Sequence, residues 1–144
     1  MAAWTIVLGV DALNALMTGA FAGSEAFPGP VQRVEPGRIH VVRPFHPSML
    51  RPGDLVSGPT LMGVADTAAY TLILAHVGPE LMTVTSSLNI NFLRGAKKGD
   101  IHADAELLTL GRRNAVCDIR LWTESPQRLA AQATVTYARA LPAS

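Results

Sequence analysis

The stretch that most constrains the fold runs from Pro59 to Val77 and reads PTLMGVADTAAYTLILAHV. Proline suits the first turn of a helix, where its missing N–H costs nothing, and the Gly78-Pro79 pair provides a stop. Asp66 is the only acidic or basic residue in this stretch before His76, and apolar or small residues occupy every side of the predicted helix. Because such a helix is buried on nearly all sides, the rest of the chain has to wrap around it.

Apolar and polar residues alternate in four stretches after this helix. Alternation with a period of two over such lengths predicts antiparallel strands with one solvated face. The breaks between them, at residues 95–99, 110–112 and 124–128, are each short enough for a hairpin, so we expect a meander. The predicted strands are Thr83–Phe92, Asp100–Leu107, Asn114–Glu124 and Leu129–Tyr137.

Upstream of the buried helix, the spacing of apolar residues predicts an amphipathic helix over Asp11–Ala22. Proline and glycine are frequent in Gly23–Pro36, which we expect to be a connecting loop, and a short strand is expected around Ile39–Val42. No Lys or Arg precedes Arg33, so the positively charged region of a signal peptide is missing. We therefore expect a cytoplasmic protein with no membrane-spanning segment.

The composition limits both the domain count and the class of partner. A chain of 144 residues fits one domain, here of the α+β class, with an antiparallel sheet wrapped around one helix. A formal charge of +1 argues against nucleic-acid binding, which needs a basic patch. Hydrophobic residues make up 49% of the chain and charged residues only 16%, so we expect part of the apolar surface to be buried between subunits of a homo-oligomer.

Asp66 is the residue that does not fit the apolar pattern of the predicted helix. A carboxylate in a buried helix costs several kcal/mol unless it is paired or its protonation changes, and only Thr67 and Tyr70 lie nearby as polar side chains. One interpretation is a structural aspartate that caps a loop or pairs with a distant arginine. The other is a general base or nucleophile in a water-poor cleft. The second is favoured by Gly58, because free N–H groups at a helix start can hold an oxyanion.

Four segments of the sequence together resemble the PaaI-like thioesterases of the hotdog-fold superfamily. They are GDLVSGPTLMGVADTAAY, VTSSLNINFLRGAKKGD, the run Gly111-Arg112-Arg113 and the terminal ATVTYARA. The resemblance implies a single hotdog domain over 1–144, with an N-terminal helix and connecting loop in residues 1–30 and the hotdog core in residues 38–140. It also implies hydrolysis of acyl-CoA thioesters at the interface of a dimer, or of a dimer of dimers.

The resemblance assigns roles to individual positions around the predicted helix. It makes Asp66 the catalytic carboxylate and Gly58 the oxyanion glycine of a His-Gly-Gly run. In this chain Ser57 replaces the histidine of that run and Pro59 its second glycine, while the preceding side-chain amide of the family falls on Arg51. We expect four residues to contact the substrate, with core packing as the alternative for the last of them: Ser57, Arg51, Thr67 and Tyr70.

Basic residues gather in two of the predicted turns, Arg94, Lys97 and Lys98 in one and Arg112 and Arg113 in the other. As a group they resemble the edge where the family binds nucleotide, so Arg94, Arg112 and Arg113 are expected to hold the phosphates of coenzyme A. The alternative is that they are solvated loop charges. The four histidines show no ligand spacing and Cys117 is the only cysteine, so we expect no metal and no cofactor beyond the coenzyme A of the substrate.

These expectations leave three functions open. The first is an acyl-CoA thioesterase that uses Asp66 and Gly58. The second is a non-catalytic protein that binds acyl-CoA or an acyl chain, and the substitutions at Ser57, Pro59 and Arg51 favour it. The third is a hydratase on the same fold, which would need a His–Asp pair, and no histidine lies near Asp66 in the sequence.

Overall fold

The computed structural model of the chain describes residues 4–21 and 30–140. The described residues form two helices and eight strands, with a short 3₁₀ turn at Pro47–Met49. In chain order they are α1 (Val10–Ala20), β1 (Val31–Glu35), β2 (Arg38–Arg43), β3 (Leu50–Arg51), β4 (Leu55–Val56), α2 (Gly58–Val77), β5 (Val84–Phe92), β6 (Ile101–Leu110), β7 (Asn114–Trp122) and β8 (Ala131–Ala138).

Helix α2 forms the centre of the fold, as its apolar sequence predicts. It begins at Gly58, one residue before the predicted start, because the Ser57 hydroxyl accepts a hydrogen bond from the Thr60 N–H and caps the helix. Gly78 ends it with a φ of 90°, a value that favours glycine. By length and composition alone α2 is apolar enough to cross a membrane, but 67% of its apolar window is buried within the fold, so here it is the core helix.

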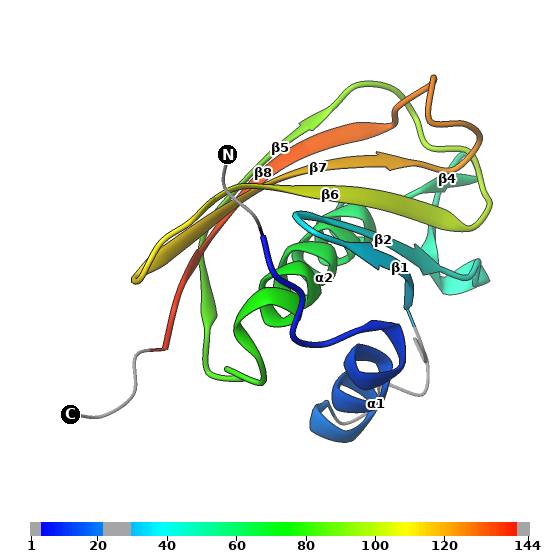
Figure 1. Cartoon of the computed structure of the whole chain (residues 1–144). Coiled ribbons are helices and arrows are strands. Elements are labelled where there is room, and N and C mark those ends of the chain that lie inside the picture. The colour runs from blue at the N-terminus through cyan, green and yellow to red at the C-terminus, as the bar shows by residue number, and fades with distance from the viewer. Residues whose placement is uncertain (1–3, 22–29, 141–144) are drawn as a thin grey trace.

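Six strands form one antiparallel sheet that curves over α2 (Figure 1). Their order is β1-β2-β6-β7-β8-β5, and β3 pairs with β4 in a separate small ribbon. Alternate residues of β6, β7 and β8 are buried against the helix, whereas their neighbours face outward. The predicted α+β fold, with an antiparallel sheet around one long helix preceded by an N-terminal helix, is confirmed.

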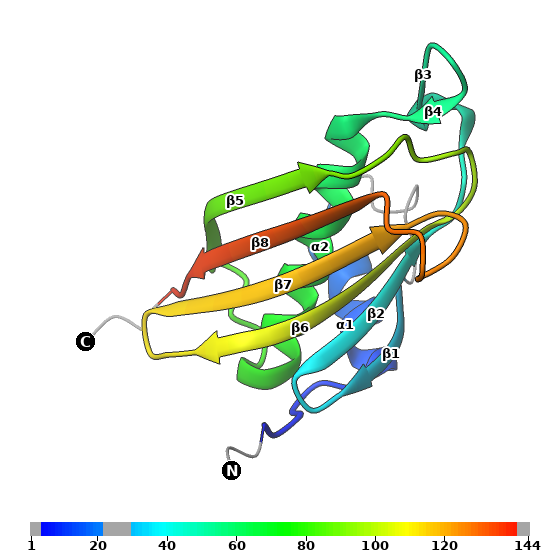
Figure 2. The ribbon, with the colours of Figure 1, turned by 90° about the horizontal axis from the view of Figure 1, so that it is seen from above.

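The expected meander of four strands is correct only for β6, β7 and β8. Strand β5 pairs with β8 rather than with β6, so residues 95–99 do not form a hairpin (Figure 2). These residues instead run past β4, where Val56 N–H donates to the Ala96 carbonyl and Leu55 bridges to Lys97. Strand β5 is therefore an edge strand, and most of its residues are exposed.

Two further expectations near the N-terminus are wrong. Strand β1 lies inside the predicted loop Gly23–Pro36 and pairs with β2. Its alternation is hidden because a bulge after Val31 shifts the register and its other side chains are largely polar. Helix α1 ends at Ala20 rather than Ala22, because Phe21 is extended and its ring packs edge-on against Tyr70. The expected end near Gly23 lies outside the described residues.

The segment before α1 packs against the C-terminal end of α2. Backbone N–H groups of Val7 and Leu8 both donate to the Ala75 carbonyl near the end of α2. The β1–β2 turn reaches the same place, where Gly37 N–H donates to His76 Nε2 at 3.0 Å. Trp4 covers this turn and lies edge-on to the His76 ring. The N-terminal segment and the β1–β2 turn thus pack together around the end of α2.

Replacing Gly37 by alanine tests this contact. Gly37 has a φ of +76°, and an added Cβ would lie 2.5 Å from Cδ1 of Trp4. We expect Gly37→Ala to lower the free energy of unfolding by about 1–3 kcal/mol, because the backbone is strained and the indole has to move. Urea denaturation measures this. Gly19→Ala is the matched control, since nothing lies within 4 Å of its added Cβ, and it should leave stability unchanged or raise it. A Gly37→Ala midpoint at or above that of the wild type would contradict the expectation.

Candidate active site

Asp66 lies on the flank of α2 that faces β5 and β8, and its side chain is half-buried. Its Oδ1 atom accepts two hydrogen bonds, from Thr85 Oγ1 at 2.6 Å and from the Tyr137 hydroxyl at 2.7 Å. Within residues 4–21 and 30–140 no Lys, Arg or His forms an ion pair with it. In this part of the chain Asp66 therefore has no arginine partner. Two hydroxyl groups hold its carboxylate instead.

Tyr137 and Tyr70 form the wall beside this carboxylate. Burial is the main cause that raises the pKa of Tyr137, and its contact with Asp66 raises it further, so the phenol stays protonated and donates. The Tyr70 ring packs against Tyr137 with ring centroids 5.8 Å apart. Its own hydroxyl donates to the Leu81 carbonyl, and burial raises its pKa. Within one chain the Tyr70 side chain is thus packed in the core.

Sequence reasoning missed Thr85 and Tyr137. The alternation predicts that Thr85 lies on the solvated face of its strand, but a register shift between Thr85 and Ser87 breaks the alternation and turns Thr85 toward α2. Tyr137 is the last residue of its predicted strand, and nothing in the alternation there indicates a role at the site. The one signal available was that a buried tyrosine hydroxyl normally needs a hydrogen-bond partner, and the buried helix offers one carboxylate.

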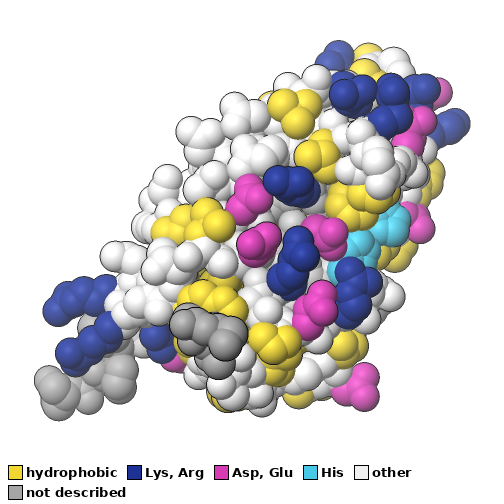
Figure 3. Space-filling view, turned by 45° about the horizontal axis from the view of Figure 1, so that its top comes forward, with side chains coloured by type: hydrophobic (Ala, Val, Ile, Leu, Met, Phe, Trp, Pro, Cys, Tyr) yellow, Lys and Arg dark blue, Asp and Glu magenta, His cyan; other side chains and the backbone are white. Residues whose placement is uncertain are grey.

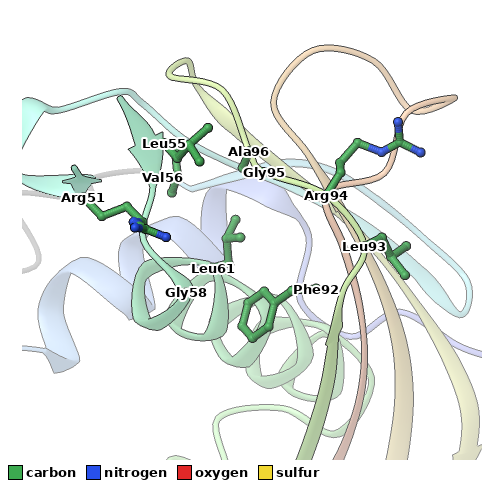
Figure 4. A pocket seen from close by; sticks show the side chains of 10 residues that line it. All are labelled: Arg51, Leu55, Val56, Gly58, Leu61, Phe92, Leu93, Arg94, Gly95 and Ala96. Carbon is green, nitrogen blue, oxygen red and sulfur yellow. The ribbon is translucent and has the colours of Figure 1, made fainter. Parts of the chain in front are cut away.

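The start of α2 lies at a separate pocket of about 450 Å³. Gly58 is the first helical residue, so its N–H has no partner one turn earlier in the helix. A Cβ at this position would lie 3.3 Å from Cζ of Phe92, so the Gly58 backbone packs closely against this ring. The Arg51 side chain extends toward the start of α2 (Figure 4). The remaining lining is mostly apolar: Leu55, Val56, Leu61, Phe92, Leu93, Gly95 and Ala96, with Arg94 at the rim.

The structure does not bring Asp66 and Gly58 together within one chain. Asp66 follows Gly58 by eight residues, which is about 12 Å along a helix axis. Asp66 is not among the residues that line the pocket at Gly58. A single carbonyl group could not contact both the carboxylate and this N–H in one subunit.

Comparisons with known proteins identify the family. The sequence matches the family model of the thioesterase superfamily over residues 53–130. This chain belongs to the thioesterase superfamily. It is 33% identical to a "putative thioesterase" from Silicibacter sp. TM1040, whose crystal structure aligns with a TM-score of 0.86 over 96% of both chains. The family activity, hydrolysis of a thioester, is therefore the general activity of this protein.

More distant structures share the fold. A thioesterase from Haemophilus influenzae is 19% identical, with a TM-score of 0.79 over 95% of this chain and 94% of that one. Zebrafish thioesterase superfamily member 2 is also 19% identical, with a TM-score of 0.78 over 92% of this chain and 99% of that one. At these identities the likeness concerns the fold alone.

The other predicted site residues of this thioesterase are dispersed. The Ser57 hydroxyl is used as the helix cap, and Thr67 Oγ1 donates to the Gly63 carbonyl on the flank of α2. Arg94 lines the pocket, and its Nε donates to the Leu129 carbonyl. Arg112 and Arg113 are exposed in the β6–β7 turn, at the opposite end of the sheet from the pocket (Figure 2). Within one chain the three predicted CoA ligands are not close together.

The histidines of the thioesterase lie away from Asp66. His40 Nδ1 contacts Asp104 Oδ1 at 2.6 Å, and His40 Nε2 contacts His102 Nδ1 at 3.1 Å. These side chains alternate with buried residues of β2 and β6, so they lie on the outer face of the sheet (Figure 3). The described residues thus contain a His–Asp pair, but the sheet separates it from α2. In this part of the chain no group of three His, Cys, Asp or Glu side chains could hold a metal ion.

The outer histidine pair predicts a dependence of stability on pH. The pKa of His102 is lowered, first by its burial against Trp122 and then by His40, while Asp100 and Asp104 oppose the shift. The unfolded chain therefore binds a proton more readily than the folded one. The contribution of neutral His102 to the free energy of unfolding is complete above its unfolded pKa of about 6.5 and is lost as the pH falls below it.

We expect the melting temperature of His102→Gln to fall less than that of the wild type on acidification. His46→Gln, which changes an exposed histidine, is the control, and equal acid sensitivity in all three proteins would contradict the expectation.

Proposed function

We propose that this thioesterase hydrolyses an acyl-CoA at a site shared by two copies of the chain, with Asp66 of one copy and Gly58 of the other. One observation carries the proposal. Asp66 accepts a hydrogen bond from Thr85 near the start of β5, whereas Gly58 packs on Phe92 at the end of β5. The two groups therefore mark opposite ends of the same edge strand.

The exposed edge of β5 is suited to bind a second copy. Its outer side has no strand partner within the described residues, and an unpaired edge readily pairs with another strand. Large apolar side chains are exposed along it and on the adjoining turn and helix: Met82 at 77%, Val84 at 56%, Leu93 at 53%, Phe92 at 52% and Met62 at 39%. Such exposure is unusual for a protein that remains a monomer.

A two-fold axis through the middle of β5 explains how the separated groups would meet. Antiparallel pairing of β5 with its copy puts the start of one strand beside the end of the other. Asp66 of one copy would then face the pocket at Gly58 of the second, and the dimer would hold two such sites. The same operation moves the Arg112–Arg113 turn of one copy toward Arg94 of the other. The dispersed cations would thereby form one surface for the phosphates of coenzyme A.

The chemistry at this shared site follows from the groups present. As a general base, the Asp66 carboxylate takes a proton from water, and the resulting hydroxide adds to the thioester carbonyl carbon. The Gly58 N–H, at the positive end of α2, stabilises the oxyanion that forms. Collapse of the tetrahedral intermediate breaks the C–S bond, and the leaving thiolate receives the proton from Asp66. As a nucleophile, Asp66 would instead attack the carbonyl carbon and expel the thiolate, which leaves a mixed anhydride. Water then opens the anhydride to the free acid and the Asp66 carboxylate, and the thiolate takes up the proton that the water releases.

A second candidate is a protein that binds acyl-CoA without hydrolysing it. The Ser57 hydroxyl is engaged in capping α2, and Arg51 places a charged side chain in the pocket. Neither group reproduces the histidine and amide that the resemblance associates with these positions. Binding of acyl-CoA without release of free thiol would favour this candidate.

Removing the Asp66 charge tests the catalytic assignment. Asp66→Asn keeps the shape of the side chain but cannot accept a proton, so we expect kcat for thiol release to fall by roughly 10²–10⁴-fold. Release of free coenzyme A from short-chain, long-chain and aromatic acyl-CoAs measures it and also identifies the preferred acyl group. Asp11→Asn, an exposed change on α1, serves as the control. Full turnover by the Asp66→Asn protein would exclude Asp66 as base or nucleophile.

Mixing two inactive variants tests whether the site is shared. Gly58→Pro removes the N–H at a position where a helix tolerates proline, but it also adds a ring beside Phe92. Gly58→Ala keeps the N–H and controls for this added bulk. A dimer of one Asp66→Asn chain and one Gly58→Pro chain has one intact site. After subunit exchange at equal concentrations, activity should recover to about one quarter of the wild type. If the mixture stays as inactive as its components although mixed dimers form, each site is built within one chain.

A further inference from the structure

We infer that Tyr137 is a positioning residue for Asp66: its hydroxyl, together with that of Thr85, holds Oδ1 and leaves Oδ2 as the atom that reacts. The inference rests on the proposed role of Asp66. It extends the site to strand β8, to which the sequence and the family resemblance assigned no functional residue.

The hydrogen bonds of Asp66 distinguish its two oxygen atoms. Both Thr85 Oγ1 and the Tyr137 hydroxyl approach Oδ1, at 2.6 and 2.7 Å. The Tyr137 hydroxyl is also 3.2 Å from the backbone carbonyl oxygen of Asp66, so it is fixed relative to the helix and not only to the side chain. No group in the described part of the chain donates to Oδ2. A carboxylate held in this way has one anchored oxygen and one that is free to accept a proton or attack a carbonyl.

Tyr137 is better placed than Thr85 to act as the anchor. It is only 3% exposed and lies within the sheet, paired with Ala115 of β7 on one side and Thr85 of β5 on the other. Its ring packs against Tyr70, whose hydroxyl is bound to the Leu81 carbonyl and whose ring contacts Phe21. Burial raises the pKa of Tyr137, so the hydroxyl remains a donor wherever the carboxylate is charged. Thr85 lies on the edge strand and is exposed.

The direction of Asp66 matters because the other reacting groups would come from a second chain. A base in a shared site has to point across the β5 edge, and small errors of orientation lower the rate without preventing the substrate from binding. Loss of an anchoring hydroxyl should therefore act on kcat much more than on KM. A structural role of Tyr137, by contrast, would lower stability and the amount of active enzyme but not the turnover of the folded protein.

Tyr137→Phe removes the hydroxyl and keeps the ring. We expect kcat for acyl-CoA hydrolysis per folded dimer to fall about tenfold or more, with KM within about twofold, since a hydrogen bond to a charged group is lost. Thr85→Val should behave in the same direction, and Thr85→Ser, which keeps a hydroxyl, should retain a kcat close to that of the wild type. Thr136→Val is the matched control: it removes a hydroxyl from the next residue of β8, which faces away from Asp66.

Asp66→Asn is measured beside these variants to separate the two claims. If Asp66→Asn is inactive but Tyr137→Phe and Thr85→Val turn over like Thr136→Val, the positioning inference is overturned and the role of Asp66 stands. Full activity of Asp66→Asn would overturn both. Circular dichroism and melting curves establish that each variant is folded. Should Tyr137→Phe not fold, the Thr85 variants decide alone, and a Thr85→Val kcat equal to that of Thr85→Ser would overturn the inference.

Discussion

The burial of helix α2 is the constraint on which the rest of the structure depends. A 20-residue helix that is apolar on every side has to be covered, and one curved sheet covers most of it. The N-terminal segment and the β1–β2 turn cover its far end near His76. The cover ends at β5, so the flank of α2 that carries Asp66 lies at the boundary of the sheet. The candidate site therefore lies where the sheet ends, at its edge strand β5.

The parts of the fold that could be predicted are those in which one local pattern decides the outcome. The caps and composition of α2 and the alternation in β6, β7 and β8 are of this kind. The pairing of β5 with β8 is not, because an alternating strand carries no signal for which neighbour it will pair with. Strand β1 escaped prediction because a bulge interrupts an already short pattern. Both failures concern strands at the edges of the sheet.

In the candidate site, the residues on the helix could be predicted from the sequence, whereas those on the sheet could not. Asp66 and Gly58 stand out because each is unusual in an apolar helix or at its start. Thr85 and Tyr137 look ordinary in their own strands, and they gain a role only because strands far apart in the sequence meet the helix at one point. The bulge beside Thr85 adds to the difficulty, since it reverses which face a residue presents. The resemblance to thioesterases supplied positions, but not these partners.

The way Asp66 is held bears on what it can do. An arginine partner would orient the carboxylate, but it would also neutralise it and occupy oxygen atoms that a base needs free. Two hydroxyl groups on one oxygen orient it while leaving its charge uncompensated. Among the described residues no cation pairs with Asp66. The scarcity of charged residues in this sequence, which favours a buried interface, is thus also consistent with a carboxylate that hydroxyl groups hold in place of a cation.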